Sequence, residues 1–379
     1  MDKNSAKETY LNDGEAAPTV HRLPRFAIVF YVITALCAVL YVVFLFSKSF
    51  SDFFNRYISS VVRAALAHLT GWIPFSLAEY LIILLPMILV LLASIGMRKY
   101  ADTWRGVFVF CGAVLSVAGL IFSVFTLGFA PAYRGSTLDE KLGLERTEVS
   151  AEELYETALI LAKAAEAEYG EIKYSSSTHF SVMPYNYSKM NDLLIEAYDK
   201  VCDEYTFIAR LDSNIKPIML SEPMSYTHIT GVYTFFTGEA NLNVAFPDHT
   251  LPYTAAHELS HQRGIAREDE ANFMAFIVCT ASDDAYIRYC GYVNLYDYVA
   301  SALYSASPEL YAKVRDTLPS EIRAEQRAYS EFFDKYRDSV ASDVSETVNN
   351  AYLTLHGTEG TKSYGMVVDL AVAYYHSDK

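Results

Sequence analysis

The residues of this sequence that could do chemistry are concentrated in residues 253–276, which read YTAAHELSHQRGIAREDEANFMAF. His257 and His261 are four residues apart, so on a helix their imidazoles project from the same face. Two neutral imidazoles at this spacing can hold a zinc ion, with Glu258 beside a water bound to the metal. Zinc lowers the pKa of such a water, so Glu258 can act as general base and pass the proton to a leaving amine.

A catalytic zinc site needs a third protein ligand, and the acidic residues behind the two histidines offer one. Gly264 is a natural helix stop, and a second helix starting near Ala266 could fold a carboxylate back onto the metal. Glu268 and Asn272 share a helix face, whereas Glu270 points elsewhere. We therefore expect Glu268 as the ligand, Glu270 as its alternative, and Asn272 as a residue that orients a ligating histidine.

The competing interpretation is a surface helix with two solvated histidines. The Gly264 turn, the acidic cluster and the strand-like run at residues 231–246, which could align an extended peptide by β-addition, all favour the metal site. Within that run, Glu239 and Asn241 are expected either to contact a substrate backbone or to form a turn. Asp269 is expected to be a solvated residue at a helix start. Donors that could stabilise an oxyanion are left open. They are His228, Tyr226, Tyr233, Tyr286, Tyr289 and Tyr292.

Composition narrows the classes of partner and of metal site. The chain has 379 residues, of which 52% are hydrophobic, and a formal net charge of −15. This charge disfavours nucleic acid as a partner, because phosphate binding needs a basic face. Five cysteines without a CxxC pair indicate neither a disulfide framework nor a cysteine zinc site, and a Cys279–Cys290 bridge is left open.

The apolar residues are gathered in three stretches, residues 26–46, 77–95 and 106–129, each long enough to span a bilayer as a helix. We predict a membrane region at 26–129 that follows a disordered cytoplasmic tail at residues 1–25. Between the first two spans, residues 51–69 have apolar side chains at helical spacing, with Arg56 and Arg63 on the other side. This pattern predicts a helix in the membrane interface, with a plain surface helix as the alternative.

Basic residues indicate the orientation, because they flank the first span and fill the loop between the second and third. These residues are Arg22, Arg25, Arg98, Lys99 and Arg105. By the positive-inside rule they lie in the cytoplasm, which places residues 130–379 outside the cell membrane.

The region after the spans is expected to be mainly helical, with a small sheet before the metal-binding helix. Ser150 and Glu153 have the spacing of a capping box at a helix start. We predict helices at residues 150–169, 187–211, from 253 onward, at 320–344 and at 364–375, and strands at 217–221, 231–236 and 241–246.

Three strings, TGEANLNVAF, HELSHQRGIAREDEANF and SYGMVVDLAVAYY, resemble the domain-of-unknown-function 3810 family. The resemblance runs from the first span to the C-terminus. It implies a bacterial protein with about three N-terminal spans and a predicted zinc metallopeptidase domain, in which His257, Glu258, His261 and an acid of EDEAN form the site. We therefore expect a zincin-like domain that binds Zn²⁺ and hydrolyses an exported or membrane-proximal polypeptide.

Two other functions compete with this one. The zinc domain could belong to a membrane sensor that binds a ligand or cleaves only itself. Such a sensor would need a partner protein, because the cytoplasmic loop at residues 97–105 is too short to be an output domain. The second alternative is a membrane scaffold in which the motif occurs by chance. The Gly264 turn and the acidic cluster disfavour it.

Overall fold

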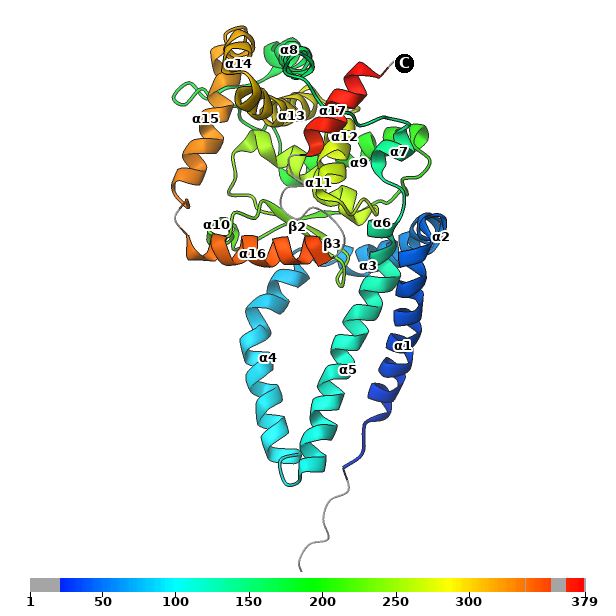
Figure 1. The fold of residues 1–379 in the computed structure, drawn as a ribbon. Helices are drawn as coiled ribbons and strands as arrows, with labels where there is room; N and C mark the ends of the chain where they lie inside the picture. Colours follow the sequence, from blue (N-terminus) through cyan, green and yellow to red (C-terminus); the bar gives the residue numbers. More distant parts are fainter. Residues whose placement is uncertain (1–20, 338, 356–365, 378–379) are drawn as a thin grey trace, which may run out of the picture.

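The computed structural model describes residues 21–337, 339–355 and 366–377. Three long apolar helices stand below a mostly helical domain, and the domain covers one end of the three helices (Figure 1). Of the tail expected at residues 1–25, residues 1–20 lie outside the described part of the chain.

The three long helices are α1 (Arg25–Phe46), α4 (Leu77–Lys99) and α5 (Trp104–Gly128). Each is long and apolar enough to cross a membrane, and at most 11% of its most apolar window is buried inside the protein. The three predicted apolar helices are thus present, with shifted ends. α4 continues to Lys99, past residue 95, because basic side chains are favourable in the last turn of a helix.

Tryptophan marks both ends of the apolar helices. The chain has two tryptophans. Trp72 precedes α4 at the domain end and is 79% exposed, whereas Trp104 begins α5 at the opposite end and is 81% exposed. Because tryptophan side chains concentrate at the two interfaces of a bilayer, these positions indicate where the bilayer surfaces would lie.

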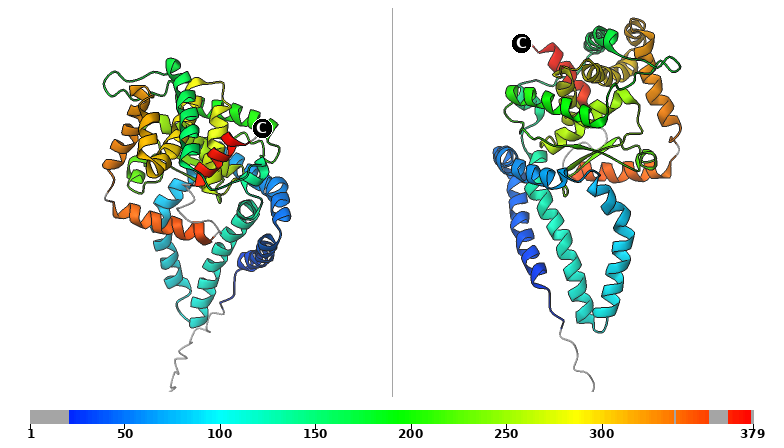
Figure 2. Two further views of the ribbon diagram at one scale, coloured as in Figure 1. Left: turned by 45° about the horizontal axis from the view of Figure 1, so that its top comes forward. Right: turned by 180° about the vertical axis from the view of Figure 1, so that it is seen from behind.

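The segment expected as an interfacial helix at residues 51–69 consists of three consecutive helical pieces, α2 (Lys48–Phe54), the π-helical η1 (Asn55–Ser59) and α3 (Ser60–Gly71). They lie across the domain ends of the long helices (Figures 1 and 2). The expected place of Arg63 on a polar face was wrong, because Arg63 is only 2% exposed. Its guanidinium donates to the carbonyls of Gly128 (2.7 Å) and Arg263 (3.3 Å), as a buried cation requires partners.

The domain core is formed by helices packed around α11, α12 and α13, with α8 against α13. The longer helices are α8 (Ala151–Glu168), α9 (Tyr187–Glu204), α11 (Leu251–Gln262), α12 (Glu268–Thr280), α13 (Ala285–Ala306), α14 (Pro308–Arg315), α15 (Ser320–Asp334), α16 (Val340–Leu355) and α17 (Val367–His376). Short helices are α6 (Ala130–Arg134), α7 (Leu138–Leu142) and α10 (Ser221–Ser225). Cys279 and Cys290 are both free thiols.

Some predicted helix ends are confirmed and others are corrected. The capping box of α8 is present, with Ser150 and Glu153 bonded to each other's backbone N–H groups. α9 ends at Glu204, before the expected residue 211. The helix predicted at residues 320–344 is two helices, α15 and α16, with a turn at residues 335–337 after α15. Of the last predicted helix, residues 364 and 365 lie outside the described residues.

The sheet before α11 has three short strands, β1 (Ile215–Pro217), β2 (Gly231–Thr234) and β3 (Glu239–Leu242). Their order is β1-β3-β2, with β1 parallel and β2 antiparallel to β3. Compared with the predicted ranges, β1 and β3 begin two residues earlier and β2 ends two residues earlier. β2 thus forms one edge of the sheet, beside α11.

The sheet is bonded directly to the start of α4. The Glu239 carboxylate accepts hydrogen bonds from the N–H groups of Leu77 (3.0 Å) and Ala78 (2.9 Å). It therefore caps the first turn of α4, where backbone N–H groups lack partners within the helix. Glu239 was expected to contact a substrate backbone or to form a turn. In the structure it is the first residue of β3, and its carboxylate joins this strand to α4.

Candidate metal centre

His257 and His261 project from one face of α11, as their spacing predicts. Both side chains are buried, and their Nε2 atoms lie 3.0 Å apart. Pro252 in the first turn suits this helix start, because proline there gives up an N–H that has no partner within the helix. The helix therefore presents two ligand nitrogens toward one point.

Gly264 ends α11 and reverses the chain. Its φ of +91° is a left-handed conformation that favours glycine. A Cβ at this position would lie 2.4 Å from a guanidinium nitrogen of Arg63, and Asn55 donates to the Gly264 carbonyl at 2.9 Å. After this turn α12 begins at Glu268, two residues later than expected, and its first residue faces the histidines.

Glu268 completes a group of three donor atoms. Its Oε2 lies 3.1 Å from Nε2 of His257 and 3.7 Å from Nε2 of His261. Ligands at about 2.0–2.1 Å from a tetrahedral zinc ion are separated by about 3.3 Å. The three observed separations of 3.0, 3.1 and 3.7 Å bracket that value, so the donor set fits zinc. Among the described residues, this is the single grouping of three metal-ligating side chains.

A backbone carbonyl orients His261. Nδ1 of His261 lies 2.8 Å from the carbonyl oxygen of Ile265, in the turn that follows Gly264. When Nδ1–H donates to this carbonyl, Nε2 of the neutral ring keeps its lone pair for a metal. The same turn that positions Glu268 thus selects the ligating nitrogen of His261.

In this group, burial and the neighbouring charges have opposite effects on the pKa values of His261 and Glu268. Burial favours the neutral form of His261, but the charge and hydrogen bond of Glu268 outweigh burial and raise the pKa of His261 to about 9. For Glu268, burial is outweighed by the two histidines, which hold the pKa of its carboxyl well below the usual range. The group is therefore arranged around a position that suits a positive charge.

Glu258 lies beside the group but outside it. Burial raises the pKa of Glu258 to about 7, against the charges of the two histidines, which lower it. The backbone N–H of Tyr233, on edge strand β2, donates to its carboxylate. A Cβ on Gly231 would lie 2.6 Å from Oε1 of Glu258, so the strand leaves just enough room for this side chain. Glu258 is thus a buried carboxyl with a pKa suited to exchanging a proton near neutrality.

The other acids of the EDEAN cluster serve packing between helices. Glu270 accepts from the N–H of Leu138 at 2.9 Å and is not in the three-residue group. Asp269 was expected to be solvated, but it is 4% exposed and pairs with Arg146 at 2.9 Å. Within the described residues the side-chain nitrogen of Asn272 has no hydrogen-bond partner, so its orienting role stays a prediction.

The expected oxyanion donors have other contacts. His228 lies 3.0 Å from the Tyr336 carbonyl, and Tyr226 packs on the Tyr336 ring. The remaining tyrosines pack in the domain core or on Phe129. Sequence reasoning missed Tyr298 and Tyr352. The pKa of each is raised by burial and, to a smaller degree, by the charge of Glu268, and that of Tyr352 reaches about 12.

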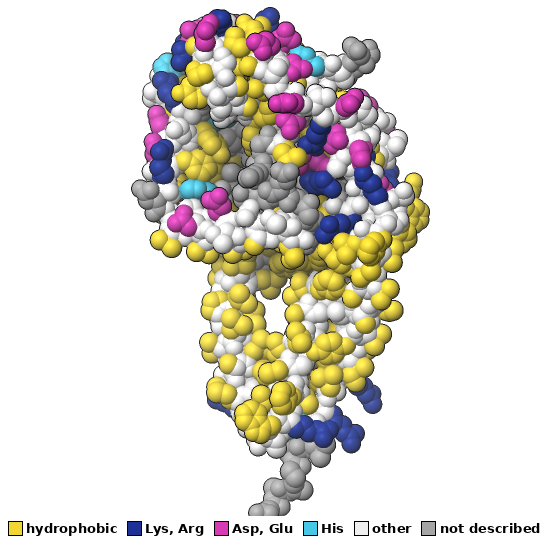
Figure 3. All heavy atoms as spheres, in the orientation of Figure 1, with side chains coloured by type: hydrophobic (Ala, Val, Ile, Leu, Met, Phe, Trp, Pro, Cys, Tyr) yellow, Lys and Arg dark blue, Asp and Glu magenta, His cyan; other side chains and the backbone are white. Residues whose placement is uncertain are grey.

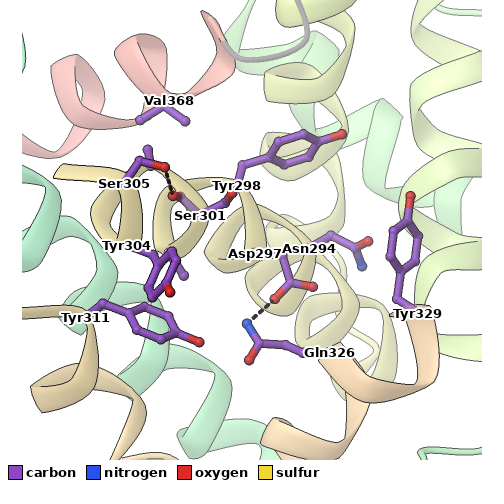
Figure 4. Close-up of a pocket in the computed structure, with 12 residues that line it drawn as sticks. Asn294, Asp297, Tyr298, Ser301, Tyr304, Ser305, Tyr311, Gln326, Tyr329 and Val368 are labelled. Carbon is purple, nitrogen blue, oxygen red and sulfur yellow. Dashed lines mark hydrogen bonds between the residues drawn. The ribbon is translucent and has the colours of Figure 1, made fainter. Parts of the chain in front are cut away.

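Tyr298 also borders a cavity. The cavity has a volume of about 740 Å³ and is lined by residues of α13 and α15 together with Tyr311 of α14 and Val368 of α17 (Figure 4). Asp297 accepts a hydrogen bond from Gln326 at 2.8 Å on its wall. The residues that line the cavity do not include His257, His261 or Glu268.

A family model described as a protein of unknown function, DUF3810, matches residues 50–372. The chain belongs to the DUF3810 family. The DUF3810 match includes α4, α5, the sheet and every residue of the candidate metal centre, whereas α1 lies before it. No curated protein and no solved structure matches the chain.

Proposed function

We propose that this DUF3810 protein is a membrane-anchored zinc metallohydrolase, and that its domain is a zincin-like peptidase. One observation carries the proposal. Two imidazole nitrogens and one carboxylate oxygen from successive helices meet at the spacing of zinc ligands, beside a second buried carboxyl that is not a member of the set. A structural zinc site has no use for that second carboxyl, whereas a hydrolytic site requires a base.

In this proposal His257, His261 and Glu268 hold the metal. A bound zinc ion would supply a Lewis acid that makes water acidic enough to lose a proton near neutral pH. Glu258 takes up that proton and later gives it to the leaving amine, since burial raises the pKa of Glu258 to about 7. The Tyr233 N–H holds the Glu258 carboxylate in place for both transfers.

The position of β2 supports a polypeptide as the substrate. β2 is an edge strand, and within the described residues its outer edge pairs with no other strand. An extended peptide can add to such an edge through backbone hydrogen bonds. Because Glu258 contacts β2 at Gly231 and Tyr233, a peptide aligned there would pass beside the base.

The orientation rests on charge. Lysine and arginine side chains gather at the end of the apolar helices that lies away from the domain (Figure 3). Arg98 and Lys99 end α4, and Arg105 lies in the first turn of α5. By the positive-inside rule this end is cytoplasmic, so we propose that the domain lies outside the cell membrane.

The test uses the full chain in lipid nanodiscs and a mixture of unstructured peptides, with cleavage products identified by mass spectrometry. Wild type should cleave, a chelator should stop cleavage, and added zinc should restore it. Glu258→Gln should keep its zinc and lose roughly 10²–10⁴-fold in rate. Glu196→Gln, at an exposed position of α9, is the control and should cleave like wild type. Equal cleavage by wild type and zinc-loaded Glu258→Gln would refute the proposal.

A further inference from the structure

Helix α16 (Val340–Leu355) carries an exposed apolar face that no described part of the protein covers. We propose that this face lies on the surface of the lipid bilayer, so that α16 is a second contact between the domain and the membrane. The inference does not depend on the proposed enzymatic activity, because it concerns where the helix lies.

The side chains of α16 divide into three faces. Val340, Val344, Val348 and Leu355 are 79%, 59%, 63% and 75% exposed. At about 100° per residue these four side chains, together with the exposed Ala341 and Ala351, fall within an arc of about 100°. A continuous stripe of this kind differs from the single exposed apolar residues that any protein surface carries.

The other two faces account for the rest of the helix. Ser342 and Leu353 are buried and point into the domain. Asp343, Glu346 and Thr347 are exposed and lie on the remaining side. The helix thus meets the protein on one side, presents charge on a second and presents aliphatic side chains on the third, as expected of a helix at a boundary between lipid and water.

The position of α16 at the base of the domain indicates that lipid covers its apolar face. α16 runs across the base of the domain, transverse to the long helices, where α4 and α5 join the domain (Figures 1 and 2). Apolar side chains gather along this lower edge in Figure 3. Trp72, which marks the same end of α4, is 79% exposed. If α4 and α5 cross a bilayer, its surface therefore meets the base of the domain.

The charge of α16 defines what kind of lipid contact this is. The helix contains Asp343 and Glu346 and no lysine or arginine. Attraction to anionic lipids therefore cannot hold it, and burial of the aliphatic stripe must do so. Since the spans keep the helix at the membrane at high effective concentration, this weak contact is sufficient. The contact should accordingly form on uncharged phosphatidylcholine.

The inner side of α16 connects this contact to the metal centre. Tyr352 packs edge-on against Tyr133 of α6, with ring centroids 6.3 Å apart. Tyr133 belongs to the aromatic cluster that includes Phe129, whose ring lies 6.2 Å from that of His261. The helix that we place on lipid is thus connected to His261 through the rings of Tyr133 and Phe129.

The experiment places single nitroxide labels on the full chain in phosphatidylcholine nanodiscs. Cys111, the exposed native cysteine, is first replaced in Cys111→Ala, while the other four are buried. Labels are attached through Val344→Cys and Val348→Cys, and in a third variant through Glu346→Cys on the charged face. Ile160→Cys is the matched control, because Ile160 is 40% exposed on α8, at the end of the domain away from the spans (Figure 1).

Collisions with oxygen, which concentrates in lipid, and with a water-soluble nickel complex are then compared by electron paramagnetic resonance. We expect the labels at positions 344 and 348 to favour oxygen and the labels at 346 and 160 to favour nickel. Nickel access at 344 and 348 equal to that at 346 would overturn the proposal in favour of a solvated helix. Shielding of 344 and 348 from both reagents would overturn it in favour of a second copy or another protein.

Discussion

Among the described residues, the domain contains two buried groups that each pair histidine with glutamate, and they differ in what surrounds the pair. In the metal centre, His257 and His261 converge with Glu268 on one point. In the second group, which we name the His249–Glu325 pair, Nδ1 of His249 lies 3.1 Å from Oε2 of Glu325, with side chains 1% and 0% exposed.

The difference lies in the number of ligands that converge and in the pKa values of the carboxyl groups. Glu325 accepts hydrogen bonds from the N–H of Ser181 (2.9 Å) and the hydroxyl of Tyr289 (3.2 Å), which stabilise its charged form. Glu325 and Glu258 each have one oxygen without a hydrogen-bond partner among the described residues. Against the effect of burial, hydrogen bonds lower the pKa of Glu325, whereas burial raises the pKa of Glu258 to about 7. Burial and a nearby histidine are therefore common to both groups. A set of three ligands and a neighbouring carboxyl whose pKa is raised distinguish the metal centre from a structural ion pair.

The largest expected effect is the loss of bound zinc when His257 or His261 is replaced. His257→Ala or His261→Ala removes one of three ligands, so zinc should fall from about one ion per chain to background. His249→Gln should keep zinc and lose about 1–3 kcal/mol of unfolding free energy, because it weakens a buried pair. Elemental analysis and denaturant unfolding measure the two quantities. If His249→Gln lost its zinc as well, the two groups would not be functionally separate.

Glu268 and Glu270 should likewise differ in how much each contributes to zinc affinity. Glu268→Gln should weaken zinc binding by more than the roughly 10- to 100-fold that loss of an outer partner costs. Glu270→Gln, two residues along α12, should change zinc affinity little, because its amide oxygen can still accept from Leu138. Titration against a chelating dye gives the affinities. A larger effect of Glu270→Gln would exchange the roles of the two acids.

Gly231 tests whether the room around Glu258 matters. In Gly231→Ala the new Cβ would lie 2.6 Å from Oε1 of Glu258, so the base must shift. We expect about 100-fold slower peptide hydrolysis with zinc retained, since small displacements of catalytic groups have effects of this size. Gly170→Ala is the control, because its Cβ would meet no atom within 4 Å. Unchanged hydrolysis by Gly231→Ala would show that Glu258 need not keep this position.

The His249–Glu325 pair should make a smaller contribution, visible in the pH dependence of stability. Burial alone would raise the pKa of Glu325, but hydrogen bonds from His249 and Ser181 lower it below its usual 4.5. A lowered pKa stabilises the folded state fully above about pH 4.5, and this stabilisation is lost as the pH falls through the folded value. Unfolding free energies of wild type and Glu325→Gln measured between pH 7 and 3 should therefore converge on acidification. Parallel curves would contradict the role of Glu325.

The sequence was informative where neighbouring residues decide the structure. Long apolar runs predict helices that could cross a membrane, because a helix of that composition has few other stable environments. The spacing of His257 and His261 and the turn at Gly264 act within one or two helical turns. Helical phase likewise favoured Glu268 over Glu270 as the residue facing the histidines.

Prediction failed where the deciding partner is distant in sequence. Arg63 resembled a polar surface residue because its acceptors, Gly128 and Arg263, lie 65 and 200 residues away. Glu239 resembled a substrate contact, since nothing nearby indicates that it caps a helix 162 residues earlier. Tyr352 was missed for the same reason: no local pattern places a tyrosine of α16 beside α6.

The bond between Glu239 and the start of α4 has a mechanical consequence. A long apolar helix tilts to match the thickness of the surrounding hydrocarbon. If α4 crosses a bilayer, a change in its tilt would act through Glu239 on β3, and from β3 on the neighbouring strand β2, whose Tyr233 N–H bonds to Glu258. Exchanging short-chain for long-chain lipids should therefore alter the position of the Glu258 carboxylate, although no lipid contacts it.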